Sequence, residues 1–280
     1  MAIDYIYYPT IQLGPITIFT WGLLVAIGFL TGILLAVRYG KKIGLKEDNV
    51  YGLCFYILLG SIIGARLLFV LTNLGTFTED PLGVFKVWQG GMDFIGGLGG
   101  GVLAAYLFVK IKKLNFWTYS DLVAPYIALG HALGRLGCVL GDGGHLGKPT
   151  DFLWGIAYEG VVRHPGALYE MIALIGLFIF LIEIRKRNLK TGTLFFSYIW
   201  GYSILRFGID FLRADRIFYG LTGTQWGLIG ASIFAAIMMR KISKKEPQKE
   251  EIKLQLKQEK KEEANEPVKE TSKDELTIIE

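Results

Sequence analysis

The chain has 280 residues, 52% of them hydrophobic, and a formal net charge of +5. Residues 240–280 carry 11 basic and 11 acidic residues, so the first 239 residues hold the whole positive excess. Long uncharged runs in those 239 residues exclude an ordinary soluble core. Basic residues in short clusters between apolar segments exclude a nucleic-acid binder, and two cysteines within apolar segments (Cys54 and Cys138) exclude a secreted disulfide scaffold.

Seven segments are long and apolar enough to cross a bilayer, which takes about 20 residues as a helix. They are residues 17–37, 51–72, 91–109, 121–141, 166–184, 193–212 and 223–239. The first lacks a cleavable end of small residues, which indicates a span rather than a signal peptide. Abundant glycine inside the third segment indicates close helix packing. The predicted fold is an all-α integral membrane protein with seven transmembrane helices.

The loops between these segments predict the orientation of the chain. Fifteen basic residues follow the first, third, fifth and seventh segments, whereas five lie in the loops on the other side. By the positive-inside rule, the N-terminus is outside and the C-terminus is cytoplasmic. Residues 1–239 form the predicted transmembrane domain. Residues 240–280 form a charged cytoplasmic tail that is disordered or partly helical.

Three arginines lie inside predicted spans, although a charge at a helix centre costs roughly 2.5–3.5 kcal/mol on insertion scales. Arg66, Arg135 and Arg206 lie on the second, fourth and sixth spans, all at a similar depth near the outer ends. Arginine forms bidentate contacts with phosphate, so the trio predicts a site for an anionic phospholipid headgroup. The alternative is a snorkelling or ion-paired arginine, because Arg206 has Asp210 one turn further on.

The outside stretch 134–170 is rich in glycine, which permits tight turns and close approach to a ligand, as well as a plain re-entrant loop. At its end lie His164, Tyr169 and Glu170. The histidine can accept a proton near neutral pH and the other two can orient it, although a histidine at a helix start is also a common capping residue.

The remaining polar residues do not form a recognised motif. His131 lies one turn before Arg135 and shares its helix face, and His145 lies in the glycine-rich loop. Three dispersed histidines and two cysteines lack metal-ligand spacing, so no metal site is predicted. Cys138 is interpreted as a small buried hydrophobe rather than a nucleophile.

Several ordered motifs resemble one family. In chain order they are TWG near the start, GAR in the second span, WQGGMDFIGGLGGG, GRLGCVLGDGG, GKPTD, HPGALYE and YSILRFGIDFLRAD. From about residue 10 to 240 this pattern resembles the prolipoprotein diacylglyceryl transferases. The resemblance implies a bacterial inner-membrane enzyme with its active site toward the outer leaflet. Such an enzyme moves the diacylglyceryl group of phosphatidylglycerol to the lipobox cysteine of a prolipoprotein, and it needs no cofactor.

The resemblance also implies roles for individual residues. Arg135 matches the signature arginine that binds the lipid, and Arg206 with Tyr202 matches a later essential pair. Gly147 matches the glycine that closes the signature, and Arg66 matches the arginine of the second-span motif. In the implied reaction Arg135 and Arg206 bind the phosphate and stabilise the leaving group, glycerol 1-phosphate, with support from Arg66. Tyr202 would hydrogen-bond the lipid headgroup.

A thiol must lose its proton to attack carbon, so the reaction favours a nearby base. His164 is the leading candidate, followed by His145 and Asp142. Asp142 and Glu170 are further expected to contribute to substrate binding.

The sequence departs from the family pattern at four positions. Ile95 stands where a histidine is common, Cys138 where asparagine is common, Gly143 at the acidic position of the signature and Trp21 at a tyrosine. Two alternatives therefore stay open: a non-enzymatic lipid-binding protein or transporter, and a degenerate family member.

Overall fold

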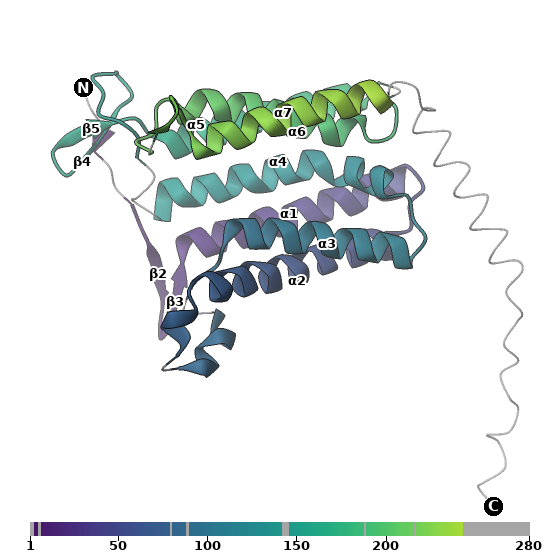
Figure 1. Cartoon of the computed structure of the whole chain (residues 1–280), viewed down its shortest axis with the longest axis horizontal. Coiled ribbons are helices and arrows are strands. Elements are labelled where there is room, and N and C mark those ends of the chain that lie inside the picture. The colour runs from purple at the N-terminus through teal and green to yellow at the C-terminus, as the bar shows by residue number, and fades with distance from the viewer. Residues whose placement is uncertain are drawn as a thin grey trace, which may run out of the picture.

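The computed structural model describes residues 3–4, 7–78, 80–87, 90–141, 146–187, 189–215 and 217–242. Within these ranges seven long α-helices run side by side, and short strands and turns lie in their connections (Figure 1). The helices are α1 (Thr20–Lys42), α2 (Glu47–Thr72), α3 (Phe94–Ile111), α4 (Phe116–Gly141), α5 (Gly166–Arg185), α6 (Thr193–Asp210) and α7 (Gly223–Ile242). Each predicted span is a helix, and the all-α membrane fold is confirmed.

The helix boundaries differ from the predicted ones where local structure intervenes. The first span was expected over 17–37, but β2 (Thr10–Leu13) and β3 (Ile16–Phe19) form an antiparallel hairpin immediately before the helix. Helix α1 therefore begins at Thr20 and continues to Lys42. Its last turn carries Lys41 and Lys42, whose positive charges interact favourably with the C-terminal end of the helix dipole.

Five helices, α1 to α5, are long and apolar enough to cross a membrane by length and composition alone. Helices α6 and α7 contain more polar residues. Arg206 and Asp210 are buried in α6, and Gln225 is buried in α7. These polar residues meet one another inside the bundle, as described below, so the same residues that make α6 and α7 less apolar also join them.

Helix α4 lies between two groups of helices, with α1, α2 and α3 on one side and α5, α6 and α7 on the other (Figure 1). Small residues let its neighbours approach closely: Ala124 and Ala128 are fully buried. A Cβ atom added to Gly28 of α1 would lie 2.9 Å from the carbonyl oxygen of Gly130 on α4. The two backbones thus pack almost directly against each other, as expected of small residues at membrane helix interfaces.

The glycines of the third span serve the same purpose. Helix α3 packs along α2, and a Cβ atom on Gly60 of α2 would lie 2.5 Å from the Cβ of Ala104 and 2.6 Å from the carbonyl oxygen of Gly100. Any side chain at Gly60 would force the two helices apart. The prediction of close packing is confirmed for four glycines of this span, whereas a Cβ atom at Gly90 or Gly99 would meet nothing within 4 Å; the four are Gly96, Gly97, Gly100 and Gly101.

The two ends of the bundle differ in character. One end, called here the hairpin end, carries the β-strands: the β2–β3 hairpin, the sheet of β1 (Ile3–Asp4), β4 (Ile156–Tyr158) and β5 (Val161–Arg163), and the β6 (Ile217–Phe218) and β7 (Leu221–Thr222) hairpin. Strand β1 pairs with β4 in parallel, and β4 pairs with β5 in antiparallel. Two short 3-10 helices, η1 (Leu74–Phe77) and η2 (Pro81–Phe85), lie at the same end.

The opposite end, called here the basic end, brings together the ends of α1, α3, α5 and α7 with their lysines and arginines. The guanidinium of Arg185 donates to the hydroxyl of Tyr126 at 2.9 Å and lies 3.5 Å above the Tyr39 ring. The buried carboxylate of Asp121 accepts from the backbone N–H groups of Gly192 and Phe195, which fixes the start of α6 against α4. Of the predicted tail, Arg240 to Ile242 form the end of α7, and the rest lies outside the described residues.

Candidate active site

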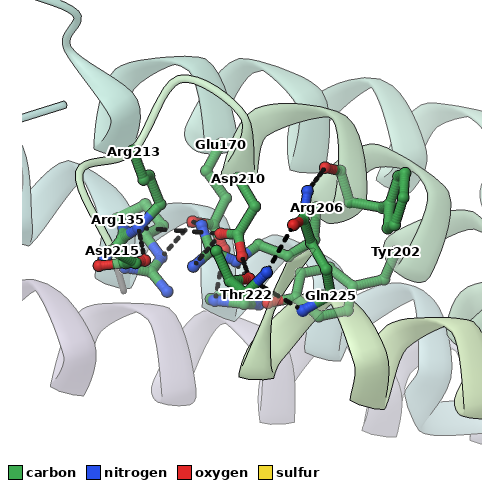
Figure 2. Close-up of polar contacts among 11 residues, drawn as sticks. Arg135, Glu170, Tyr202, Arg206, Asp210, Arg213, Asp215, Thr222 and Gln225 are labelled. Carbon is green, nitrogen blue, oxygen red and sulfur yellow. Dashed lines mark hydrogen bonds and ion pairs between the residues drawn. The ribbon is translucent and has the colours of Figure 1, made fainter. Parts of the chain in front are cut away.

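A buried carboxylate, that of Glu170, is the centre of a polar cluster inside the bundle (Figure 2). Glu170 is the fifth residue of α5, close to the hairpin end, and is 1% exposed. One carboxylate oxygen, Oε2, lies 3.0 Å from Nη1 of Arg206 and 3.2 Å from Nε of Arg135. The other, Oε1, accepts from the Tyr202 hydroxyl at 3.2 Å and lies 3.6 Å from Nε2 of His131. One acidic residue thus joins α4, α5 and α6.

The partners of Glu170 come in pairs spaced by four residues. His131 and Arg135 lie one turn apart on α4, and Tyr202 and Arg206 lie one turn apart on α6. Because residues four apart share one face of a helix, each pair points to the same carboxylate. The face shared by His131 and Arg135 was predicted, and the structure confirms it.

A second buried carboxylate, Asp210, extends the cluster toward α7. Its Oδ1 lies 2.9 Å from Nη2 of Arg206, and its Oδ2 accepts from the hydroxyl of Thr222 at 2.7 Å. Thr222 and Gln225 in turn exchange hydrogen bonds at the start of α7, where each backbone N–H is accepted by the other side chain. This reciprocal arrangement is a capping box, and it fixes the first turn of α7 next to Arg206.

The two arginines that pair with Glu170 are engaged to different degrees. Arg206 pairs with Glu170 through one terminal nitrogen and with Asp210 through the other, and its side chain is 8% exposed. The alternative prediction of an Arg206–Asp210 ion pair is therefore confirmed as a contact. Arg135 is 19% exposed, and its Nε makes no hydrogen bond. No described residue hydrogen-bonds its Nη groups.

Arg66 is placed differently, and the prediction of three arginines at one shared site is not met for it. Its guanidinium donates to four backbone carbonyls of the loop between α2 and α3, those of Gly83, Val84, Gly90 and Gly91. Its charged group also lies 5.6 Å and 5.5 Å from the ring centroids of Phe69 and Phe77. A common depth on three helices did not specify the direction in which each side chain points.

The contacts of Arg66 predict a role in holding this loop. Arg66→Lys is expected to destabilise the protein by on the order of 2–3 kcal/mol, because an ammonium cannot satisfy carbonyls in four directions. Limited proteolysis should show faster cleavage within residues 73–93, together with a lower midpoint temperature. Lys86→Gln is the control, because it removes a more exposed ion pair with Asp80 in the same loop. A loss of affinity for phosphatidylglycerol in Arg66→Lys, with the loop intact, would contradict the structural role.

His164, predicted as the leading base, lies in the connection between α4 and α5 rather than in the cluster. Its Nδ1 lies 3.3 Å from the hydroxyl of Tyr169, and its ring is 6.5 Å from that of Phe152. Its backbone carbonyl accepts from Gly147 N–H at 2.7 Å. A Cβ atom on Gly147 would collide with the carbonyl oxygen of Leu212, so glycine is required there for close packing of the loop.

Four other residues were singled out from the sequence, namely Asp142, Gly143, His145 and Cys138. Asp142, His145 and Gly143 lie outside the described residues. Cys138 is buried in α4, in keeping with its interpretation as a small core residue. In the part of the chain that the structure describes, no group of three His, Cys, Asp or Glu side chains is arranged to hold a metal ion.

An apolar cavity of about 440 Å³ lies beside the cluster, mainly between α1, α2 and α4. His131 and Gly130 line it near the Glu170 cluster, and Val123 and Tyr126 line it further toward the basic end. From His131 to Val123 the cavity follows α4 for eight residues, or about 12 Å at 1.5 Å per residue. A long apolar cavity that ends at a polar, partly charged cluster suits an amphipathic ligand with an alkyl chain and an anionic head.

Known proteins are similar in sequence to most of this chain. A family model described as prolipoprotein diacylglyceryl transferase matches residues 9–241. A Halalkalibacterium halodurans protein named phosphatidylglycerol–prolipoprotein diacylglyceryl transferase is 37% identical over 222 residues, which cover 75% of this chain and 76% of the relative. Proteins of the same name from Bacillus cytotoxicus and Bacillus cereus are each 34% identical over 251 residues, which cover 84% of this chain and 93% of each relative.

Proposed function

The chain belongs to the prolipoprotein diacylglyceryl transferase family, and we propose that the cluster around Glu170 is the site of the transfer. The protein is a multi-pass membrane enzyme whose substrates are phosphatidylglycerol and a prolipoprotein with a lipobox cysteine. The reaction joins the diacylglyceryl group to the cysteine sulfur as a thioether and releases glycerol 1-phosphate. The site must therefore hold a phosphodiester, stabilise a phosphate leaving group and admit a thiol.

The available guanidinium edge of Arg135 is the observation that carries this assignment. Arg135 lies on the face of α4 that also carries His131, and its Nη groups have no hydrogen-bond partner among the described residues. A guanidinium can bind two phosphate oxygens side by side, and this contact strengthens as charge collects on the leaving phosphate. Arg135 is therefore assigned to phosphate binding and to stabilisation of the leaving group.

Arg206, Tyr202 and Glu170 are assigned to holding Arg135 in place and to forming the polar wall of the site. Arg206 is already paired with two carboxylates, so it contributes mainly through Glu170, whose Oε2 it shares with Arg135. The hydroxyl of Tyr202 is committed to Oε1 of the same carboxylate. This shell fixes the orientation of Arg135 before substrate binds, which lowers the entropic cost of reaching the transition state.

The apolar cavity is assigned to an acyl chain of phosphatidylglycerol. It begins beside His131, close to the phosphate site, and its walls in α1, α2 and α4 are almost entirely apolar. A chain in this cavity would anchor the diacylglyceryl group while the phosphate is held by Arg135. Binding energy from the part of the lipid that does not react can thus position the carbon that does.

The site is further assigned to the outer leaflet of the bacterial cytoplasmic membrane. Glu170 lies near the start of α5 at the hairpin end, whereas the basic loops gather at the opposite end. The positive-inside rule assigns the basic end to the cytoplasm, and the hairpin end then faces outward. Gly147, which packs in the outer loop beside the site, is assigned to shaping its entrance, and substrate binding by Asp142 stays a prediction.

The activity is tested with purified protein, phosphatidylglycerol and a synthetic lipobox peptide. The peptide is expected to gain the mass of one diacylglyceryl unit, with release of an equal amount of glycerol phosphate. A peptide whose cysteine is replaced by serine is the control, because a neutral hydroxyl is a far weaker nucleophile than a thiolate. Saturable lipid binding without any gain of mass would contradict the proposal and favour a lipid-binding protein.

A further inference from the structure

The proposed transfer requires a group that removes the proton from the lipobox thiol. A free cysteine thiol has a pKa of about 8.5, so only a few per cent is ionised near neutral pH. We propose that His131 is the general base of the transfer, with Glu170 holding and charge-balancing its ring. This inference rests on the proposed function and adds a catalytic residue to the site.

The position of the His131 ring carries the proposal. Nε2 faces Oε1 of Glu170 at 3.6 Å, and the ring centroid lies 5.2 Å from that of Tyr202. The side chain is 23% exposed and lines the apolar cavity. No described residue hydrogen-bonds Nδ1. One ring nitrogen is thus directed to a carboxylate, and the proposal places the incoming thiol at the other.

The chemical step balances at these atoms. The S–H bond of the lipobox cysteine breaks and its proton passes to Nδ1 of His131. The thiolate sulfur then attacks the glyceryl carbon bonded to the phosphate oxygen. The S–C bond forms, the C–O bond breaks, and the electron pair leaves with the phosphate oxygen toward Arg135. The products are the thioether and glycerol 1-phosphate, and the proton remains on the imidazolium until it is released to water.

The charged and titratable groups around His131 determine how it can act. Burial of the ring opposes the charged imidazolium most strongly, Glu170 on α5 stabilises it, and Arg135 on the same helix and Arg206 on α6 oppose it. Tyr202 on α6 faces the ring, and Cys54 of α2 lines the same cavity. Because each arginine is paired with Glu170, and Arg206 also with Asp210, their opposition is reduced. Glu170 therefore acts on His131 through its charge at 3.6 Å and favours the protonated ring.

Other groups near the site are less suited to this role. Both oxygens of Glu170 are committed, one to two arginines and the other to Tyr202 and His131. Tyr202 uses its hydroxyl proton in the bond to Glu170. His164 pairs with Tyr169 in the outer connection and contacts none of the residues of the Glu170 cluster in the described part of the chain.

The test compares His131→Gln with the wild type in the peptide assay between about pH 6 and pH 9.5. Near pH 7 the variant is expected to lose on the order of 100-fold in kcat, with KM for phosphatidylglycerol within about threefold of the wild-type value. The deficit should shrink as the pH rises past about 8.5, because the peptide thiol then ionises without a base. Ser120→Ala is the matched control on α4, since among the described residues its hydroxyl donates a hydrogen bond only to the carbonyl of Phe116.

Each outcome separates the proposal from its alternatives. A deficit of equal size at every pH would make His131 structural, and a rate within about threefold of the wild type near pH 7 would remove it from the reaction; either result overturns the proposal. A pH-dependent loss in His164→Gln, with His131→Gln active, would assign the base to His164 instead. His131→Asn is the second variant, and loss of lipid binding in both variants would also overturn the proposal. If the wild-type protein transfers no diacylglyceryl group, the proposed function is wrong, and the role of His131 falls with it.

Discussion

Arg135→Gln is expected to lower kcat/KM for diacylglyceryl transfer by about 100- to 1000-fold, equivalent to about 2.7–4 kcal/mol of transition-state stabilisation. The guanidinium edge of Arg135 is open to an anion, whereas Arg206 is held between two carboxylates. Glutamine keeps a hydrogen-bond donor but removes the positive charge and the fork that bind phosphate oxygens. Initial rates with a lipobox peptide at several phosphatidylglycerol concentrations measure the effect.

Two further variants test whether the rate depends on the charge of Arg135, on its planar geometry or on the overall field. Arg135→Lys retains the positive charge without the planar fork and should recover only part of the lost rate. Lys86→Gln removes a positive charge at the same end of the bundle, where Lys86 pairs with Asp80, and should leave the rate close to that of the wild type. Equal losses in Arg135→Gln and Lys86→Gln would mean that the assay responds to the overall field rather than to a phosphate contact.

Glu170→Gln is expected to have the largest effect on stability, a loss of about 3–5 kcal/mol. Glu170 is 1% exposed, and among the described residues its carboxylate is the one ion-pair partner of Arg135 and one of two ion-pair partners of Arg206. The amide removes the compensating negative charge and leaves two guanidinium groups close together inside the bundle. Unfolding midpoints of the purified protein in detergent, or yields of folded protein, measure this loss.

The double variant Glu170→Gln/Arg206→Gln provides an internal test of that explanation. The double variant removes one of the uncompensated positive charges, so it should be more stable than Glu170→Gln alone. Such a gain would show energetic coupling between the two residues, because the effects of independent sites simply add. Glu183→Gln is the control: its ion pair with Lys186 lies on the surface, and its loss should not change the midpoint measurably. A double variant less stable than either single variant would contradict charge compensation as the cause.

The helices could be predicted from the sequence because membrane spans depend on the length of apolar segments, which a single chain displays directly. Local pairs were also accessible: His131 with Arg135, and Arg206 with Asp210, follow from a spacing of four residues. The T-x-x-Q pattern of Thr222 and Gln225 is the signal of a capping box and marks the start of α7.

The central role of Glu170 could not be predicted in the same way. It was expected to contribute to binding, but its contacts come from α4 and α6, and no spacing along one helix specifies which neighbours a side chain will meet. Arg66 shows the same limit: the sequence placed it on the second span, but the direction of its side chain depends on the loop between α2 and α3. The position of a residue along a span can be read from one segment of the sequence, whereas a site is formed by several segments packed together.

The cluster explains how charged groups can persist inside an apolar bundle and still be available for chemistry. Glu170 and Asp210 offset Arg206 and most of the charge of Arg135, so the protein avoids the cost of isolated buried charges. The incomplete pairing of Arg135 leaves a site that an incoming phosphodiester can complete. In the proposed reaction the phosphodiester adds a second negative charge beside this guanidinium, next to that of Glu170.

The most direct test of this account is a structure of the protein with an unreactive phosphonate analogue of phosphatidylglycerol, in which carbon replaces the oxygen of the bond that breaks. The account predicts the phosphorus about 4–5 Å from the guanidinium carbon of Arg135, as in bidentate arginine–phosphate contacts. It also predicts one acyl chain in the cavity beside Gly28 and Gly130. A phosphorus atom bound instead beside His164 and Gly147, with the guanidinium of Arg135 unoccupied, would contradict it.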